Sequence, residues 1–137
     1  MTQPAKPTTF PNISGYVISE RLYTGAHTTV YRGIETASQR SVILKVLLQA
    51  FPSVDDLVCF RNQYAITQNL NIPGVARPIA LAPWQNGYVL VTEDFGGLSL
   101  RQYTRAHYAK GSMPVIDVLG IALQLTDILR NLSQHSV

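Results

Sequence analysis

The sequence is poor in cysteine, and Cys59 is the only one among its 137 residues. One cysteine cannot form a disulfide within the chain, and no histidine or second cysteine lies near it at the spacing of a zinc site. We therefore interpret Cys59 as a buried free thiol. The chain also has no signal-peptide pattern and no apolar run of the roughly 18 residues that a membrane span needs. These absences predict a cytoplasmic protein without a membrane span.

Charge is scarce as well. Charged residues make up 14% of the chain, and the net charge is only +3. Lysine and arginine form no run, which excludes nucleic acid as an expected partner. Apolar residues make up 46%, which is typical of a globular protein with a core of its own.

The chain divides into a loose start, a strand-rich part and a helical end. Residues 1–15 are rich in proline and threonine without periodicity, which predicts a flexible N-terminal arm. The dipeptide Asn86-Gly87 predicts a hairpin, and short links between the early strands favour an antiparallel sheet. Five β-prone runs separated by turn signals predict strands at 16–24, 28–35, 39–48, 75–82 and 87–93.

Three helices are also predicted. The first begins after Ser53, a good N-cap followed by two aspartates that favour a helix start, and it runs to about Leu70. The others span about 98–107 and 115–132. The fold class is therefore α+β: a five-stranded antiparallel sheet with one packed helix, followed by the first two helices of an incomplete helical lobe.

The last predicted helix is apolar on several faces and therefore needs partners on several faces. Between Val115 and Leu132 its only charges are Asp117, Asp127 and Arg130. We expect the chain to be the front part of something larger. The helix would then meet protein partners, the rest of its own lobe, or a second copy in a homodimer.

Lys45 is the one charged residue in the apolar run from Ser41 to Leu47. A buried ammonium group needs an anion or several acceptors. Gln63 is the candidate, because it lies within an apolar helical stripe that would face the sheet, formed by Cys59, Phe60, Ile66 and Leu70. We predict a direct hydrogen bond of about 2.7–3.2 Å between the two side chains. The alternative is that Lys45 only extends outward from an edge strand.

The order of these elements resembles the N-terminal lobe of a eukaryotic-type (Hanks-type) serine/threonine protein kinase. The stretches "PGVARPIAL" and "VLVTEDFGGLSL" resemble in particular the kinase domains that open large cyanobacterial multidomain sensor kinases. The resemblance implies that residues 16–95 form the ATP-binding lobe and hinge. Residues 96–137 would hold the first helices of a truncated C-terminal lobe.

The resemblance assigns phosphate contacts to the first three strands. The glycine-loop pattern G-x-G-x-x-G-x-V, aligned to end on Val30, places its three glycines at Tyr23, Gly25 and Thr28, so Gly25 is its only remaining glycine. Lys45 matches the lysine that holds the α- and β-phosphates. Gln63 stands where the family has the glutamate partner of that lysine, and Ile43 replaces the alanine above the adenine ring.

The hinge follows the fifth strand. Thr92 would be the gatekeeper beside the adenine pocket, and the backbone of Glu93 and Phe95 would bond the adenine edge. Asp94-Phe95-Gly96 spells the magnesium-binding D-F-G tripeptide, but its place in the hinge predicts no metal site.

The resemblance implies a function with two alternatives. The chain would be the front part of a serine/threonine kinase domain in a signalling protein, with ATP as its ligand and magnesium held only by segments that the sequence lacks. It contains no H-R-D catalytic loop, so no catalytic residue is assigned, no phosphoryl transfer is expected, and ATP should bind weakly or not at all. One alternative is a pseudokinase-like interaction or regulatory module. The other is an unrelated small α+β binding domain.

Overall fold

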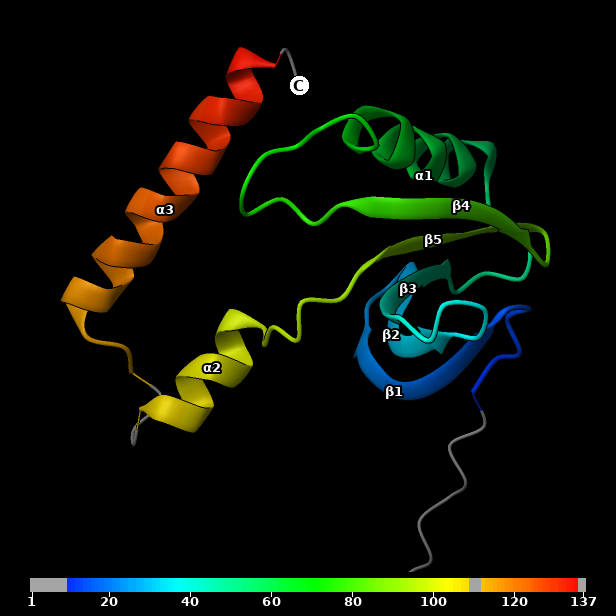
Figure 1. Ribbon diagram of the computed structural model, residues 1–137, viewed down its shortest axis with the longest axis horizontal. Coiled ribbons are helices and arrows are strands. Elements are labelled where there is room, and N and C mark those ends of the chain that lie inside the picture. The colour runs from blue at the N-terminus through cyan, green and yellow to red at the C-terminus, as the bar shows by residue number, and fades with distance from the viewer. Residues whose placement is uncertain (1–9, 109–111, 136–137) are drawn as a thin grey trace, which may run out of the picture.

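The computed structural model describes residues 10–108 and 112–135. The sheet and α1 form one layered body, and α2 and α3 lie to one side of it (Figure 1). The elements in chain order are β1 (Tyr16–Thr24), β2 (Thr28–Glu35), β3 (Ser41–Leu47), α1 (Val54–Thr67), β4 (Pro78–Trp84), β5 (Gly87–Glu93), α2 (Leu100–His107) and α3 (Val115–Gln134).

The sheet confirms the predicted α+β fold. Its strand order is β1-β2-β3-β5-β4, and every neighbouring pair is antiparallel. Pro78 and Pro83 fit β4 because it is an edge strand, where a missing N–H leaves no gap in the ladder. The predicted hairpin joins β4 to β5, but its turn residues are Gln85 and Asn86. Gln85, with φ of 51°, takes a left-handed conformation in this turn, and Gly87 pairs with Trp84 at the start of β5.

The two faces of β3 pack into different apolar clusters, because successive side chains of a strand alternate. Val42, Leu44 and Val46 join Val89 and Val91 of β5 in one cluster. The opposite face contributes Leu47, which packs with Phe60 of α1 and Leu90 of β5. The second cluster holds α1 against the face of the sheet that also carries Lys45.

Helix α1 begins as predicted and faces the sheet with a different stripe. Ser53 and Asp56 form a reciprocal capping box. The residues that pack on the sheet are Leu57, Phe60 and Tyr64, spaced by three and four. The predicted burial of Cys59 is wrong: it is exposed, as is much of Ile66. Phe60 belongs to both the predicted and the observed stripe, so the sequence alone did not determine which side of the helix faces the sheet.

The arm predicted for residues 1–15 is too long. Residues 1–9 lie outside the described part of the chain. Ile13 is only 3% exposed and belongs to the first apolar cluster, and Phe10 packs edge-on against Tyr31. The Trp84 indole donates a hydrogen bond of 3.0 Å to the Asn12 carbonyl. Residues 10–15 therefore cover the sheet face opposite α1. The proline-rich composition of this segment gave no sign of the contacts that Phe10, Asn12 and Ile13 make.

Helix α3 turns a mixed polar and apolar side toward the rest of the chain. The space between α3 and α2 is lined from α3 by Ile116, Asp117, Gly120, Ile121 and Gln124, and Ile128 contacts Gly74 in the loop between α1 and β4. The opposite side carries large apolar residues that are about half or more exposed: Val115, Val118, Leu119, Leu123, Leu125 and Leu129. Among the described residues, no helix is long and apolar enough to cross a membrane.

Candidate functional site

Strand register brings four of the predicted site residues onto one face of the sheet. Val30 of β2 lies directly opposite Lys45 of β3, and Ile43 lies directly opposite Thr92 of β5. Directly paired residues of antiparallel strands share a face. Since Ile43 and Lys45 are two residues apart in β3, both pairs point to the side on which α1 packs.

Lys45 and Gln63 are in contact, as predicted. Lys45 Nζ donates a hydrogen bond of 2.9 Å to Gln63 Oε1. The ammonium group also lies 5.4 Å from the centre of the Phe60 ring, a distance at which a cation is attracted to the ring face. Burial lowers the pKa of Lys45, because partial removal of the ammonium group from water disfavours its charged form. The alternative of an outward-pointing lysine is wrong.

This pair gives a first testable prediction. Replacing Gln63→Glu should turn the hydrogen bond into an ion pair and stabilise the chain by up to about 1 kcal/mol, because Gln63 is exposed and solvent weakens such pairs. Urea unfolding of the wild type, Gln63→Glu, Lys45→Met and the double variant gives the coupling energy. A gain that persists in the Lys45→Met background would show that the new carboxylate acts on something other than Lys45.

A cleft of about 230 Å³ lies at the hinge. Ile43 and Phe95 line it, together with Leu22 of β1. Leu22 was not identified from the sequence. Its only signal was that it is the one apolar residue between Glu20 and Tyr23, directly before the start of the glycine-loop pattern. Gly25, Val30, Lys45 and Thr92, all described, are not among the lining residues, so the cleft covers only the adenine end of the predicted site.

The phosphate end of the predicted site is covered by Tyr23. Tyr23 pairs with Val30 and so lies on the same face as Lys45. Its phenol ring folds over Gly25: a Cβ placed on Gly25 would lie 2.6 Å from the Tyr23 hydroxyl oxygen. The Gly25 amide donates to the Thr28 carbonyl at 2.8 Å. The Gly25 N–H is therefore used within the turn, and the Tyr23 ring lies against this one remaining glycine.

The hinge side chains are engaged within the protein. Glu93 accepts a hydrogen bond from the Arg77 amide through its carboxylate and donates to the Arg77 carbonyl through its own N–H, both at 3.0 Å. Phe95 is 77% exposed, so its side chain adds one wall of the cleft and little burial. The backbone roles predicted for Glu93 and Phe95 remain predictions.

Asp94 is the most strongly engaged residue of the hinge. Its side chain is 6% exposed, and its carboxylate accepts from Ser41 Oγ at 2.7 Å, the Gly96 amide at 2.9 Å and Arg32 Nε at 2.8 Å. Burial alone would raise the pKa of Asp94, but these hydrogen bonds and the Arg32 charge outweigh burial and lower it. In the described part of the chain, no three His, Cys, Asp or Glu side chains gather as metal ligands.

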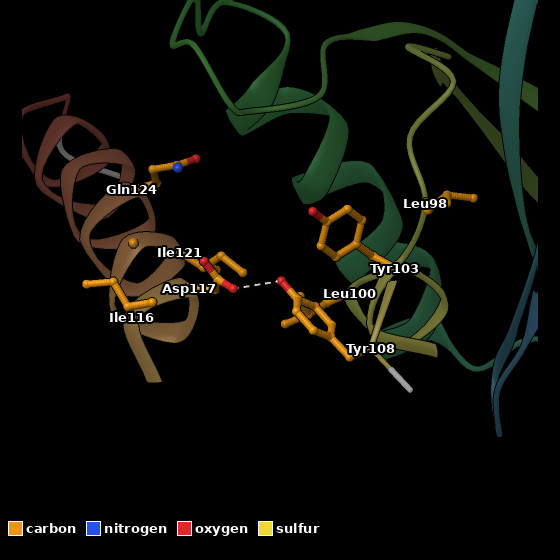
Figure 2. Close-up of a pocket in the computed structure, with 9 residues that line it drawn as sticks. Leu98, Leu100, Tyr103, Tyr108, Ile116, Asp117, Ile121 and Gln124 are labelled. Atoms are coloured by element: carbon orange, nitrogen blue, oxygen red, sulfur yellow. Dashed lines mark hydrogen bonds between the residues drawn. The ribbon is translucent and has the colours of Figure 1, made fainter. Parts of the chain in front are cut away.

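A second, larger cleft of about 590 Å³ separates α2 from α3. In Figure 2, Leu100, Tyr103 and Tyr108 on the α2 side lie opposite Asp117 and Ile121 of α3. The Tyr108 hydroxyl donates to Asp117 Oδ2 at 2.9 Å, and this bond raises the pKa of Tyr108 to about 12. The cleft contains none of the predicted site residues.

The arrangement matches solved structures of the kinase domain of PknI from Mycobacterium tuberculosis. One has a TM-score of 0.70 at 19% sequence identity, over 91% of this chain and 50% of the kinase domain. Another has a TM-score of 0.70 at 20% identity, over 89% of this chain and 49% of the kinase domain. The chain thus spans about half the length of the kinase domains it matches. No protein-family model and no curated protein matches the sequence.

At these identities the likeness concerns the fold. The chain has the fold of a Hanks-type kinase N-terminal lobe followed by the early helices of the C-terminal lobe, as the sequence predicted. The alternative of an unrelated α+β binding domain is therefore wrong. Nothing in these matches tests the cyanobacterial sensor context, which stays a prediction.

Proposed function

We propose that residues 16–95 are the nucleotide-binding lobe and hinge of a serine/threonine protein kinase domain, and that α2 and α3 begin its second lobe. The observation that carries the proposal is the bond between Lys45 Nζ and Gln63 Oε1. It joins the third strand to the helix that packs on the sheet, which is where a kinase joins its phosphate-binding lysine to that helix.

The two ends of the site suit ATP unequally. The hinge cleft offers a purine base the apolar side chains of Leu22, Ile43 and Phe95. The phosphate end has Lys45, but Tyr23 covers Gly25, and among the described residues no carboxylate pairs with the lysine. We therefore propose that the chain binds ATP weakly, with the base contributing more than the phosphates.

The chain by itself is proposed not to transfer phosphate. The reaction needs an aspartate base and metal ligands, and no H-R-D loop occurs in the 137 residues. The D-F-G tripeptide cannot substitute, because the Asp94 carboxylate is already held by Ser41, Arg32 and the Gly96 amide. Signalling, serine/threonine specificity and a cytoplasmic location belong to the same proposal.

Titration with ATP and magnesium tests the nucleotide site. We expect a dissociation constant weaker than roughly 10 μM, which is about −7 kcal/mol, measured by amide chemical shifts in the hinge. Lys45→Met should weaken binding further, whereas Arg130→Met on α3 should leave it unchanged. Tight binding would mean that the departures at Tyr23 and Gln63 cost little. Shifts confined to α2 and α3 would contradict the proposed site.

A second candidate function is an interaction module, and the outer side of α3 favours it. Helices of globular proteins normally turn their apolar side inward. Helix α3 lines the cleft with Asp117 and Gln124 as well as two isoleucines, and it leaves four of its leucines exposed on the other side. Such a patch marks an interface. We propose that this side of α3 binds protein, and that a second copy of the chain covers it when the chain is isolated.

A further inference from the structure

Arg32 ties the hinge to the first two strands. Its Nε donates to Asp94 at 2.8 Å, one terminal nitrogen donates to Glu20 of β1 at 3.0 Å, and the other donates to the Gly97 carbonyl at 3.4 Å. Ser41 at the start of β3 bonds the same Asp94 oxygen at 2.7 Å. One guanidinium group therefore connects β1, β2 and both sides of the hinge turn.

The pair of Arg32 and Asp94 differs from an ordinary surface ion pair. Asp94 is 6% exposed and Arg32 only 25%, so solvent weakens their attraction less than that of exposed pairs. For comparison, the ion pair of Arg40 and Glu35, between the end of β2 and the start of β3, is longer at 3.5 Å, and its arginine side chain is 52% exposed. Arg32 and Asp94 also both line the hinge cleft, which Arg40 does not.

We propose that the Arg32–Asp94 pair is a clamp that fixes the hinge segment 94–97 and thereby sets the purine specificity of the cleft. This inference rests on the proposed nucleotide site. Arg32 bonds Asp94 at one end of this segment and the Gly97 carbonyl at the other. Between them lie Phe95, whose backbone is expected to meet the base, and Gly96, which has a left-handed φ of 70°. Two glycines in this segment would otherwise leave it conformationally free.

The chemical consequence concerns which purine is accepted. Adenine presents a donor at its amino group and an acceptor at N1, whereas hypoxanthine presents the reverse order. A hinge held in one conformation offers its N–H and C=O groups in one order only, so it pairs with one base and leaves the other with unmatched polar groups. A released hinge can rotate its peptide groups and lose that discrimination. Arg32 and Asp94 are thus positioning residues that act through the backbone of Phe95.

The first test needs no nucleotide. Hydrogen exchange of the amides of residues 94–98 is compared in the wild type, Arg32→Ala, Asp94→Asn and Arg32→Lys, with Arg40→Ala as the matched control. We expect exchange to rise at least fivefold in Arg32→Ala and Asp94→Asn. Arg32→Lys should recover part of the protection, and Arg40→Ala should match the wild type. Wild-type exchange in both clamp variants would overturn the clamp.

The second test reads specificity in the same proteins by titration with ATP and ITP. The ratio of the two affinities should fall at least threefold in Arg32→Ala and stay unchanged in Arg40→Ala. A released hinge with an unchanged ratio would overturn the positioning role. If the wild type binds neither nucleotide, the proposed function fails and the specificity role fails with it, while the exchange data still decide whether the hinge is clamped.

Discussion

The isolated chain is expected to elute from size-exclusion chromatography as a homodimer held together by α3. Each large leucine side chain left in water forgoes about 1.5–3 kcal/mol of burial, and several such residues together equal the whole stability of a small domain. Leu119, Leu123, Leu125 and Leu129 are 54–68% exposed on one broad side of the helix. A two-fold dimer would place the same patch of both copies face to face.

Two lysine substitutions at adjacent positions test which side of α3 associates. Leu123→Lys puts a charge into the exposed patch and should weaken the dimer at least tenfold, as judged by light scattering across a concentration series. Gln124→Lys adds the same side chain on the side that lines the cleft with α2, and the dimer should persist. A wild-type monomer at high concentration, with residues 115–134 protected from hydrogen exchange, would contradict the interface.

Much of the fold could be predicted because its signals are local. Alternation defined the strands, Ser53 marked the start of α1, and Lys45 inside an apolar strand required a polar partner. Gln63 was found because it is a polar residue within an apolar stripe of the one helix that could face the strand. The contact of 2.9 Å confirms the predicted pairing, although Cys59 and Ile66 of the helical stripe used to argue it are exposed.

What the sequence concealed depends on contacts between distant residues. Arg32 and Asp94 are 62 residues apart, and nothing periodic connects an arginine in a strand with an aspartate in a hinge. Resemblance to a known tripeptide drew attention to Asp94 as a possible metal ligand and gave no hint of a clamp. Tyr23 appeared only as a missing glycine, yet its ring covers Gly25. The contacts of Asp94 and of Tyr23 both depend on where the side chains point in the fold, which residue type alone does not indicate.

Restoring the phosphate end should strengthen ATP binding more than any other change. The variant Tyr23→Gly, Thr28→Gly, Gln63→Glu removes the ring over Gly25, returns two glycines to the loop and gives Lys45 a carboxylate partner. Open backbone amides then become available to phosphate, and a charge-assisted pair holds the lysine in place. We expect ATP affinity to rise at least tenfold, which corresponds to about 1.4 kcal/mol.

Two control variants distinguish the effect of the Tyr23 ring on ATP affinity from that of its hydroxyl, and the effect of Lys45 from that of the glycine loop. Tyr23→Phe keeps the ring over Gly25 and should leave ATP affinity at the wild-type level. Adding Lys45→Met to the restored variant should remove most of the gain, because the phosphates would lose the cation that the new carboxylate orients. Calorimetry with ATP and magnesium measures all four proteins, and thermal unfolding checks that each is folded. A folded restored variant that binds no better than the wild type would show that Tyr23 and Gln63 do not limit nucleotide binding, and the proposed phosphate site around Lys45 would be wrong.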